Sequence, residues 1–147
     1  MIDRIDCSIL KLLARNARLS LKELAAGISL SAPSTTERLR RLEERGTIRA
    51  YTIDVEPKQL GYAIQALVRV RPLPGRVQIV QKLIESTPEI VECDKVTGDD
   101  CFVARLFVRS MEHLDEVLES LAAEAATSSS IVKRQVIARR QPPMAPI

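Results

Sequence analysis

Residues 31–49 read SAPSTTERLRRLEERGTIR, and this stretch decides the fold of the first part of the chain. Ser31 is a preferred residue for capping a helix N-terminus, and Pro33 fits the first turn, where no backbone N–H is needed. Gly46 predicts the end of the helix. A buried stripe at helical spacing is expected from Thr35, Leu39 and Leu42. The stretch therefore predicts an amphipathic helix with a basic outer side.

Two more helices are predicted before it. Residues 2–13 carry isoleucines and leucines at helical spacing, and Asp3 or Asp6 lies at the first turn, where the helix dipole favours negative charge. Ser20 and Glu23 form the pattern of a capping box, and Gly27 is expected to end the second helix by taking a positive φ. Three short helices, the last two joined by a short turn, predict a helix-turn-helix.

The outer side of the third helix suits DNA. Hydroxyl side chains can exchange hydrogen bonds with base edges, and an arginine can bind guanine through two hydrogen bonds, whereas other arginines suit phosphates. The predicted DNA-binding residues are Ser31, Pro33, Ser34, Thr36, Glu37, Arg38, Arg40, Arg41 and Arg49. The alternative is a solvated face that an i,i+4 pair of Glu37 and Arg41 stabilises. The three-helix context favours binding to double-stranded DNA.

Composition and charge agree with a DNA-binding protein that carries a second, neutral part. Residues 1–60 contain 11 Lys or Arg and 8 Asp or Glu, whereas residues 61–147 contain 11 of each. The local basic excess permits binding to nucleic acid. The sequence has no apolar run of membrane-spanning length and no secretory signal, so a cytoplasmic protein without a membrane is expected. Its three cysteines lack metal spacing and are expected as thiols, with a Cys93–Cys101 disulfide as the alternative.

The second half follows another rhythm. Tyr51, Ile53 and Val55 alternate with polar residues, which predicts a strand that is either a wing edge or a connector. After a boundary near residues 56–61, the pattern predicts strands at 62–70, 90–96, 101–109 and 131–139, with helices at 76–86 and 111–126. This βαββαβ order predicts a four-stranded antiparallel sheet with both helices on one face.

The chain therefore has an α+β fold, with an N-terminal winged helix-turn-helix followed by a ferredoxin-like domain. The expected parts are a DNA-binding domain at 1–50, a linker strand and hinge at 51–61, the ferredoxin-like domain at 62–140 and a disordered tail at 141–147.

Three ordered motifs resemble the Lrp/AsnC family of bacterial and archaeal transcription regulators. IDRIDCSILKLLARNARLSLKELA (2–25) is similar to the family's first two helices, and SAPSTTERLRRLEERGTIRAYT (31–52) to its recognition helix and the strand that follows. VTGDDCFVARLFVRS (96–110) is similar to the central hairpin of its sensor domain, called RAM. The resemblance spans residues 2–139. It implies a homodimer or a higher assembly of dimers, formed through the α/β domain, and roughly palindromic operators.

The resemblance also implies a small-molecule effector, an amino acid, bound between α/β domains. The family's effector loop corresponds to Thr97, Gly98, Asp99 and Asp100, and Ser129 in the serine run at 128–130 is expected at the same pocket. Many members have an aromatic residue and then an acid after this turn, whereas Asp100 and Cys101 stand here. The alternatives are an ordinary hairpin turn and a helix-to-strand loop.

Nothing in the sequence predicts catalysis, a metal or a cofactor. His113 is the only histidine, and the chain has neither a phosphate loop nor a dinucleotide-binding motif. Two other readings stay open: a sirohaem-decarboxylase-like enzyme on the same fold, and an effector-sensing module without an operator of its own.

Overall fold

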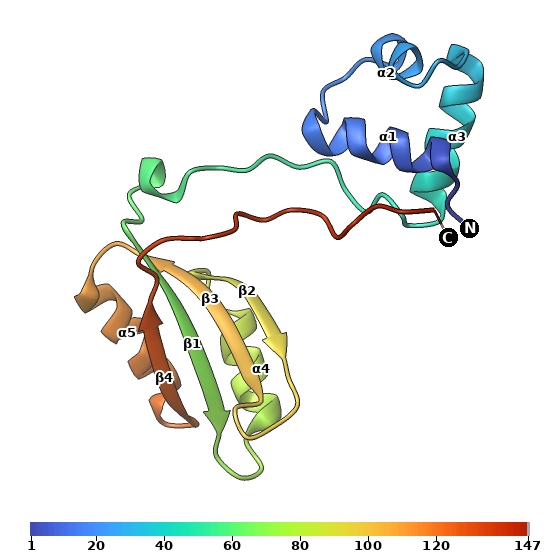
Figure 1. Ribbon diagram of the computed structural model, residues 1–147. Helices are drawn as coiled ribbons and strands as arrows, with labels where there is room; N and C mark the ends of the chain where they lie inside the picture. Colours follow the sequence, from blue (N-terminus) through green and yellow to red (C-terminus); the bar gives the residue numbers. More distant parts are fainter. Residues whose placement is uncertain (147) are drawn as a thin grey trace. The chain divides into compact units, whose positions relative to one another are not determined.

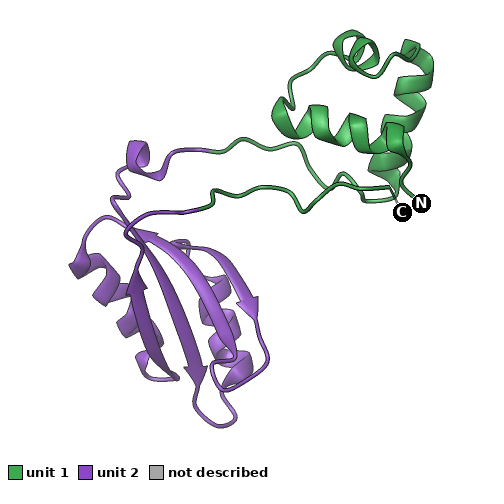
Figure 2. Cartoon of the chain, viewed as in Figure 1, with its two compact units in different colours: residues 1–54, 137–147 green, residues 55–136 purple. Residues whose placement is uncertain are grey.

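The computed structural model describes residues 1–146, which form two compact units (Figure 2). One unit contains residues 1–54 and the chain from residue 137 onward, and the other contains residues 55–136. We call them the helical unit and the α/β unit.

The helical unit begins with three helices, and the second and third have the caps that the sequence predicts. They are α1 (Arg4–Arg15), α2 (Leu21–Gly27) and α3 (Ala32–Glu44). Asp3 and Asp6 form a capping box at α1, and Ser20 and Glu23 form one at α2. The Ser31 side chain accepts a hydrogen bond from the backbone N–H of Ser34 at the start of α3. These caps satisfy backbone donors that the first turn leaves unpaired.

The ends of α2 and α3 differ in how they use glycine. Gly46 has a φ of 68° after α3, as predicted. α2 ends at Gly27, as predicted, but the predicted positive φ of Gly27 is wrong, because the positive φ after α2 belongs to Ser29 at 54°. Gly27 is instead needed for close packing: a Cβ at this position would lie 2.8 Å from Leu12 Cδ1 of α1.

The core of the helical unit is small and aliphatic. Ile9, Leu24 and Leu42, one from each helix, are at most 3% exposed. Thr35 is fully buried on α3, and Leu39 packs against the core while partly exposed. The predicted inner stripe of α3 therefore faces the other two helices.

The α/β unit is a βαββαβ sheet with two helices (Figure 1). Its elements are β1 (Ile64–Pro72), α4 (Val77–Glu85), β2 (Ile90–Lys95), β3 (Phe102–Val108), α5 (Met111–Ala122) and β4 (Ala125–Ile131). The strands are antiparallel in the order β2-β3-β1-β4. Both helices cover one face, since side chains from α4, α5, β1 and β3 share one core. This is the predicted ferredoxin-like architecture.

The predicted strand at residues 51–55 is wrong. These residues form no strand, and a short 3-10 helix, η1 (Pro57–Leu60), follows before Gly61 takes a φ of 84°. A strand requires a hydrogen-bonded neighbour, and none is recorded for this segment. Ile53 is 82% exposed, and Tyr51 and Val55 are 49% and 44% exposed, so none of the three alternating side chains enters the core.

The predicted last strand is also misplaced. β4 occupies Ala125–Ile131 rather than 131–139, and α5 ends at Ala122 rather than near 126. In its register Ala125 lies opposite Pro72 and Ile131 opposite Ala66, so small polar residues pair with β1. Beyond the strand, the N–H of Val132 still donates to the carbonyl of Gln65. The apolar residues at 136–137 are exposed.

The remaining expectations concern the tail, the membrane and the thiols. Residues 141–146 contain no helix or strand, and Ile147, the last residue of the expected tail, lies outside the described residues. Across residues 1–146, no helix has both the length and the apolar character to cross a membrane. Cys7, Cys93 and Cys101 carry free thiols, so the alternative disulfide is not formed.

Candidate DNA-binding and effector sites

The N-terminal end of α3 presents small polar side chains to solvent. Ser31, Pro33, Ser34 and Thr36 are exposed there. The Ser31 hydroxyl donates to Ser34 Oγ at 3.0 Å, and Thr36 Oγ1 donates to the carbonyl of Ala32 at 2.9 Å. A hydroxyl whose proton is used locally keeps its oxygen as an acceptor. This end of α3 can therefore approach a groove closely and accept hydrogen bonds from base amino groups.

One glutamate links two of the exposed arginines. Glu37 accepts from Arg40 Nη2 at 2.9 Å and from Arg41 Nε at 2.8 Å, so the predicted i,i+4 pair is present. These hydrogen bonds, that from Arg40 first, lower the pKa of Glu37 from its usual 4.5 to about 2. Arg40 also pairs with Glu44. The side chains of Arg40 and Arg41 are 53% and 58% exposed, so both remain accessible to a ligand.

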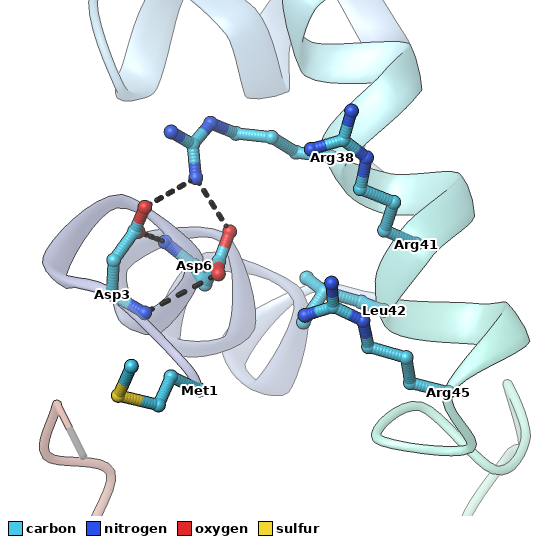
Figure 3. Close-up of a pocket in the computed structure, with 7 residues that line it drawn as sticks. All are labelled: Met1, Asp3, Asp6, Arg38, Arg41, Leu42 and Arg45. Carbon is cyan, nitrogen blue, oxygen red and sulfur yellow. Dashed lines mark hydrogen bonds and ion pairs between the residues drawn. The ribbon is translucent and has the colours of Figure 1, made fainter.

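Arg38 points elsewhere. Its side chain is only 29% exposed and extends from α3 to the start of α1, where it pairs with Asp3 and Asp6 (Figure 3). Hydrogen bonds to these carboxylates, that to Asp3 first, raise the pKa of Arg38. A cavity of about 220 Å³ lies here, lined by Met1, Asp3, Asp6, Arg38, Arg41, Leu42 and Arg45. The structure thus separates Arg38 from the exposed arginines with which the sequence groups it.

The chain leaving α3 carries one more predicted residue and one tether. Arg49 is exposed, and no ion pair is recorded for it within the described chain. Two residues later, the Tyr51 hydroxyl donates to Glu43 Oε1 at 2.7 Å. Burial, then the hydrogen bond to Glu43, raises the pKa of Tyr51 to about 12. This contact fixes the exit of the chain against α3.

The predicted effector loop is an exposed turn between β2 and β3. Thr97, Gly98 and Asp99 are exposed, and Gly98 has a φ of 106°, which favours glycine. Asp100 is partly buried and accepts a hydrogen bond from Arg71 Nη2 of β1 at 3.2 Å. The turn therefore places a carboxylate beside a guanidinium.

The structure does not bring Ser129 against this turn within one chain. Ser129 belongs to β4 and lies opposite Val68, so it is on the face that carries the helices. β1 and β3 stand between β4 and β2. The interpretation of residues 128–130 as a helix-to-strand loop is wrong, because all three are strand residues paired with β1.

Sequence reasoning missed two parts of these sites. The first is Arg71. The alternate positions of Arg69 and Arg71 in one strand, and the acidic turn at residues 99–100, could have indicated that an arginine pairs with this turn. The second is the pairing of Asp3 and Asp6 with Arg38, 35 and 32 residues away. Their place at the first turn of the helix was predicted, but a partner so distant leaves no local signal.

Taken together, the two units define a DNA-binding regulator with a helix-turn-helix domain and a separate α/β domain. Residues 2–49 match winged helix-turn-helix DNA-binding domains, and residues 65–142 match the Lrp/AsnC ligand binding domain. The chain belongs to the Lrp/AsnC family of transcriptional regulators. Membership in this family identifies the chain as a transcriptional regulator. It therefore excludes the alternative interpretation as a sirohaem-decarboxylase-like enzyme.

Several relatives share the whole architecture. The chain is 30% identical to the HTH-type transcriptional regulator LrpC of Bacillus subtilis over 92% of this chain and 94% of LrpC. The solved structure of LrpC, 29% identical, has a TM-score of 0.90 over 95% of this chain and 99% of that one. A Neisseria meningitidis transcriptional regulator solved in complex with L-methionine is 26% identical, with a TM-score of 0.91 over 97% of each chain. The feast or famine regulatory protein of Mycobacterium tuberculosis, also solved with L-methionine, is 29% identical, with a TM-score of 0.88 over 96% of this chain and 98% of its own.

Proposed function

We propose that residues 1–50 read an operator through α3, and that residues 62–140 bind an amino acid and form a homodimer, with residues 51–61 as the connection. The observation that carries this proposal is the exposed side of α3, where the hydroxyls of its N-terminal end and the two accessible arginines, Arg40 and Arg41, lie together. A transcriptional regulator must reach the DNA that it regulates, so we place this protein in the cytoplasm.

Within α3 we divide the contacts by chemistry. Ser34, Thr36 and Arg41 are assigned to base edges, since they combine acceptors with a donor fork. Arg40 and Arg49 are assigned to phosphates, which position the helix without reading sequence. Ser31 and Pro33 shape the entry of the helix, and Glu37 orients both Arg40 and Arg41 through its two oxygens.

The substitution Arg41→Ala tests the reading of bases. It should weaken binding to the operator by roughly 1–3 kcal/mol if Arg41 makes a bidentate base contact, and should have less effect on a scrambled duplex. Lys82→Ala is the matched control, because it removes one positive charge from exposed surface on α4. Fluorescence anisotropy with both duplexes measures the effect. An equal loss on operator and scrambled DNA would remove Arg41 from the base-reading residues.

For the effector, the turn offers both charges that a free amino acid needs. Amino acids carry an ammonium and a carboxylate on one carbon, and Asp100 and Arg71 lie 3.2 Å apart. Thr97, Gly98 and Asp99 provide backbone and side-chain groups beside them, and Ser129 would come from a neighbouring subunit. L-Methionine is the first amino acid to test, because two structural relatives were solved with it.

Gly98→Val tests this site against a close control. Both Gly98 and Gly75 have positive φ and open space around an added Cβ, so a valine strains each backbone without a clash. Gly98→Val should abolish the change in DNA affinity that the amino acid causes, which for allosteric proteins is about 5- to 150-fold. Gly75→Val, in the loop after β1, should keep it. A retained response in Gly98→Val would show that the effector binds elsewhere.

The face of the sheet opposite the helices supports the homodimer. Leu67 is 37% exposed there, and Val103 and Phe107 of β3 share its face. On the same face, Gln65 Nε2 is buried and has no hydrogen-bond partner within the described chain. A second copy would cover these groups, and dimers could assemble further.

Leu67→Glu should therefore convert the dimer to a monomer, because it replaces an apolar side chain that the second copy would cover with a carboxylate. Light scattering coupled to size exclusion measures the mass. Leu73→Glu introduces the same charge at an exposed leucine outside the sheet face and should leave the dimer intact. A dimer that survives Leu67→Glu would place the interface elsewhere.

A further inference from the structure

The two aspartates at the start of α1 each use one oxygen for their own helix and the other for α3. Asp3 Oδ1 accepts from the backbone N–H of Asp6 at 2.8 Å, and Asp6 Oδ2 accepts from the backbone N–H of Asp3 at 3.3 Å. Their second oxygens both accept from Arg38 Nη1, at 2.6 Å for Asp3 and 2.9 Å for Asp6. One guanidinium nitrogen thus bridges a complete capping box.

This bridge is more enclosed than the other arginine pairs of α3. The enclosure is on the Asp6 side: the side chain of Asp6 is 12% exposed and that of Arg38 29%, whereas those of Asp3, Arg40 and Arg41 are more than half exposed. Enclosure strengthens a charged hydrogen bond and makes its loss more damaging. The pKa of Asp3 is lowered, first by the hydrogen bond from the backbone N–H of Asp6 and then by that from Arg38.

The bridge also joins two helices whose shared core is small. Cys7 and Ile9 of α1 and Leu42 of α3 are at most 3% exposed, and Thr35 of α3 is fully buried. Figure 3 shows Arg38 spanning from α3 to the first turn of α1, beside the cavity. The direction of α3 relative to α1 therefore depends on this polar link.

We infer that Asp3, Asp6 and Arg38 form a positioning clamp that sets the direction of α3, and that Arg38 serves operator recognition through this clamp rather than as a phosphate ligand. The inference rests on the proposed role of α3 in reading DNA. It assigns Arg38 a task different from that of Arg40 and Arg41, although the three are neighbours in sequence.

The two roles of Arg38 predict opposite effects when an aspartate is neutralised. If Arg38 binds a phosphate, Asp3→Asn or Asp6→Asn frees it and removes a negative charge near DNA, so binding tightens. If Arg38 belongs to the clamp, the same substitutions misdirect α3 and weaken specific binding. Asp3→Asn is the gentler variant, because asparagine is itself a good N-cap and keeps the hydrogen bond from the Asp6 N–H.

The experiment measures the affinity of the full chain for its operator and for a scrambled duplex at several salt concentrations. The clamp predicts that Asp3→Asn and Asp6→Asn weaken operator binding about tenfold, as expected for residues coupled in one ion-pair network, without weakening scrambled DNA. Adding Arg38→Met to Asp6→Asn should cause little further loss. Glu44→Gln is the matched control, because it removes a carboxylate that pairs with Arg40 and not with Arg38. This substitution should not weaken binding to the operator.

Tighter operator binding by the two asparagine variants would overturn the clamp, and so would a salt slope that falls by about 0.9 in Arg38→Met, the value for one lost phosphate contact. A second readout needs no DNA. Amide residual dipolar couplings should report a changed angle between α1 and α3 in Asp3→Asn. An unchanged angle would also overturn the clamp. Failure of the unsubstituted chain to prefer its operator would instead count against the proposed function, while the dipolar couplings still decide on the clamp.

Discussion

The helical unit and the α/β unit reach a stable fold by different means. In the α/β unit, strands and helices share one core of twelve buried residues, whereas the fully buried core cluster of the helical unit has three. Burial of apolar surface is the main favourable contribution to folding. The helical unit, with the smaller core, gains less stability from it. Its polar links, two capping boxes and the bridge from Arg38, therefore matter more to its stability.

This contrast matches the division of tasks. A domain that enters a groove must keep one helix exposed, and here that helix contributes Leu42 and Thr35 to the interior while most of its other side chains stay at the surface. The α/β unit can instead bury one complete face of its sheet under α4 and α5. The comparison teaches that the DNA-reading end is held largely by hydrogen bonds and ion pairs, and the sensing end by packing.

The largest difference is expected from equivalent truncations in the two cores. Leu24 and Leu106 are both 1% exposed, so Leu24→Ala and Leu106→Ala should each destabilise their own unit by about 2–5 kcal/mol. The helical unit should unfold under conditions where the α/β unit with Leu106→Ala remains folded. Amide NMR spectra during denaturant titration follow the units separately. If both units unfolded at the same denaturant concentration in these variants, the two units would not differ in how strongly their cores stabilise them.

A smaller difference is expected from matched helix caps. Ser20 caps α2, and Ser110 caps α5 by accepting from the N–H of His113 at 3.1 Å. Ser20→Ala and Ser110→Ala should each cost about 1 kcal/mol. Because the helical unit has the smaller core, Ser20→Ala should lower its unfolding midpoint more than Ser110→Ala lowers that of the α/β unit. If Ser110→Ala lowered the unfolding midpoint of its unit more, helix caps would not be more important to stability in the helical unit than in the α/β unit.

The smallest difference is expected from acid, because the carboxylates concerned are exposed and screened by water. Hydrogen bonds lower the pKa of Asp3, Glu23 and Glu37 in the helical unit, the last to about 2, whereas Glu112 is the one carboxylate with a lowered pKa recorded in the α/β unit. A lowered pKa gives stability that is present above the ordinary value and lost as pH falls through the folded value. Between about pH 4.5 and 2, the helical unit should therefore lose stability faster.

Thermal unfolding at pH 7, 4 and 2.5, followed by NMR, measures this difference. Glu37→Gln should flatten the dependence of the helical unit on pH, and Glu116→Gln on α5, whose carboxylate makes no recorded ion pair in the described chain, is the control. Parallel losses in both units would contradict the assignment of acid sensitivity to these hydrogen bonds.

Local signals predicted the helical unit well. Ser31 and Ser20 cap their helices as the sequence predicts, because a cap acts on backbone groups within one turn, and Asp3 and Asp6 lie at the start of α1, where acids were expected. The core face of α3 was also predictable from spacing. Gly27 was not, because its role is the close approach of Leu12 from another helix, which spacing cannot show.

Long-range pairing was the part that the sequence could not supply. The β-branched run at 131–139 looked more like a strand than the alanines, threonine and serines at 125–131, yet β1 pairs with the latter. Register against a neighbour, rather than propensity, decides such a strand. Likewise, the arginines of α3 form one cluster in the sequence, and only the position of α1 separates Arg38 from Arg40 and Arg41.

The most direct test of the central claim is binding of the full chain to the DNA upstream of its own gene, at two salt concentrations, with and without a set of amino acids that includes L-methionine. The account predicts binding that exceeds binding to a scrambled duplex at both salt concentrations and that one amino acid strengthens or weakens. Equal binding to both duplexes, lost together as salt rises and unaffected by any amino acid, would contradict it.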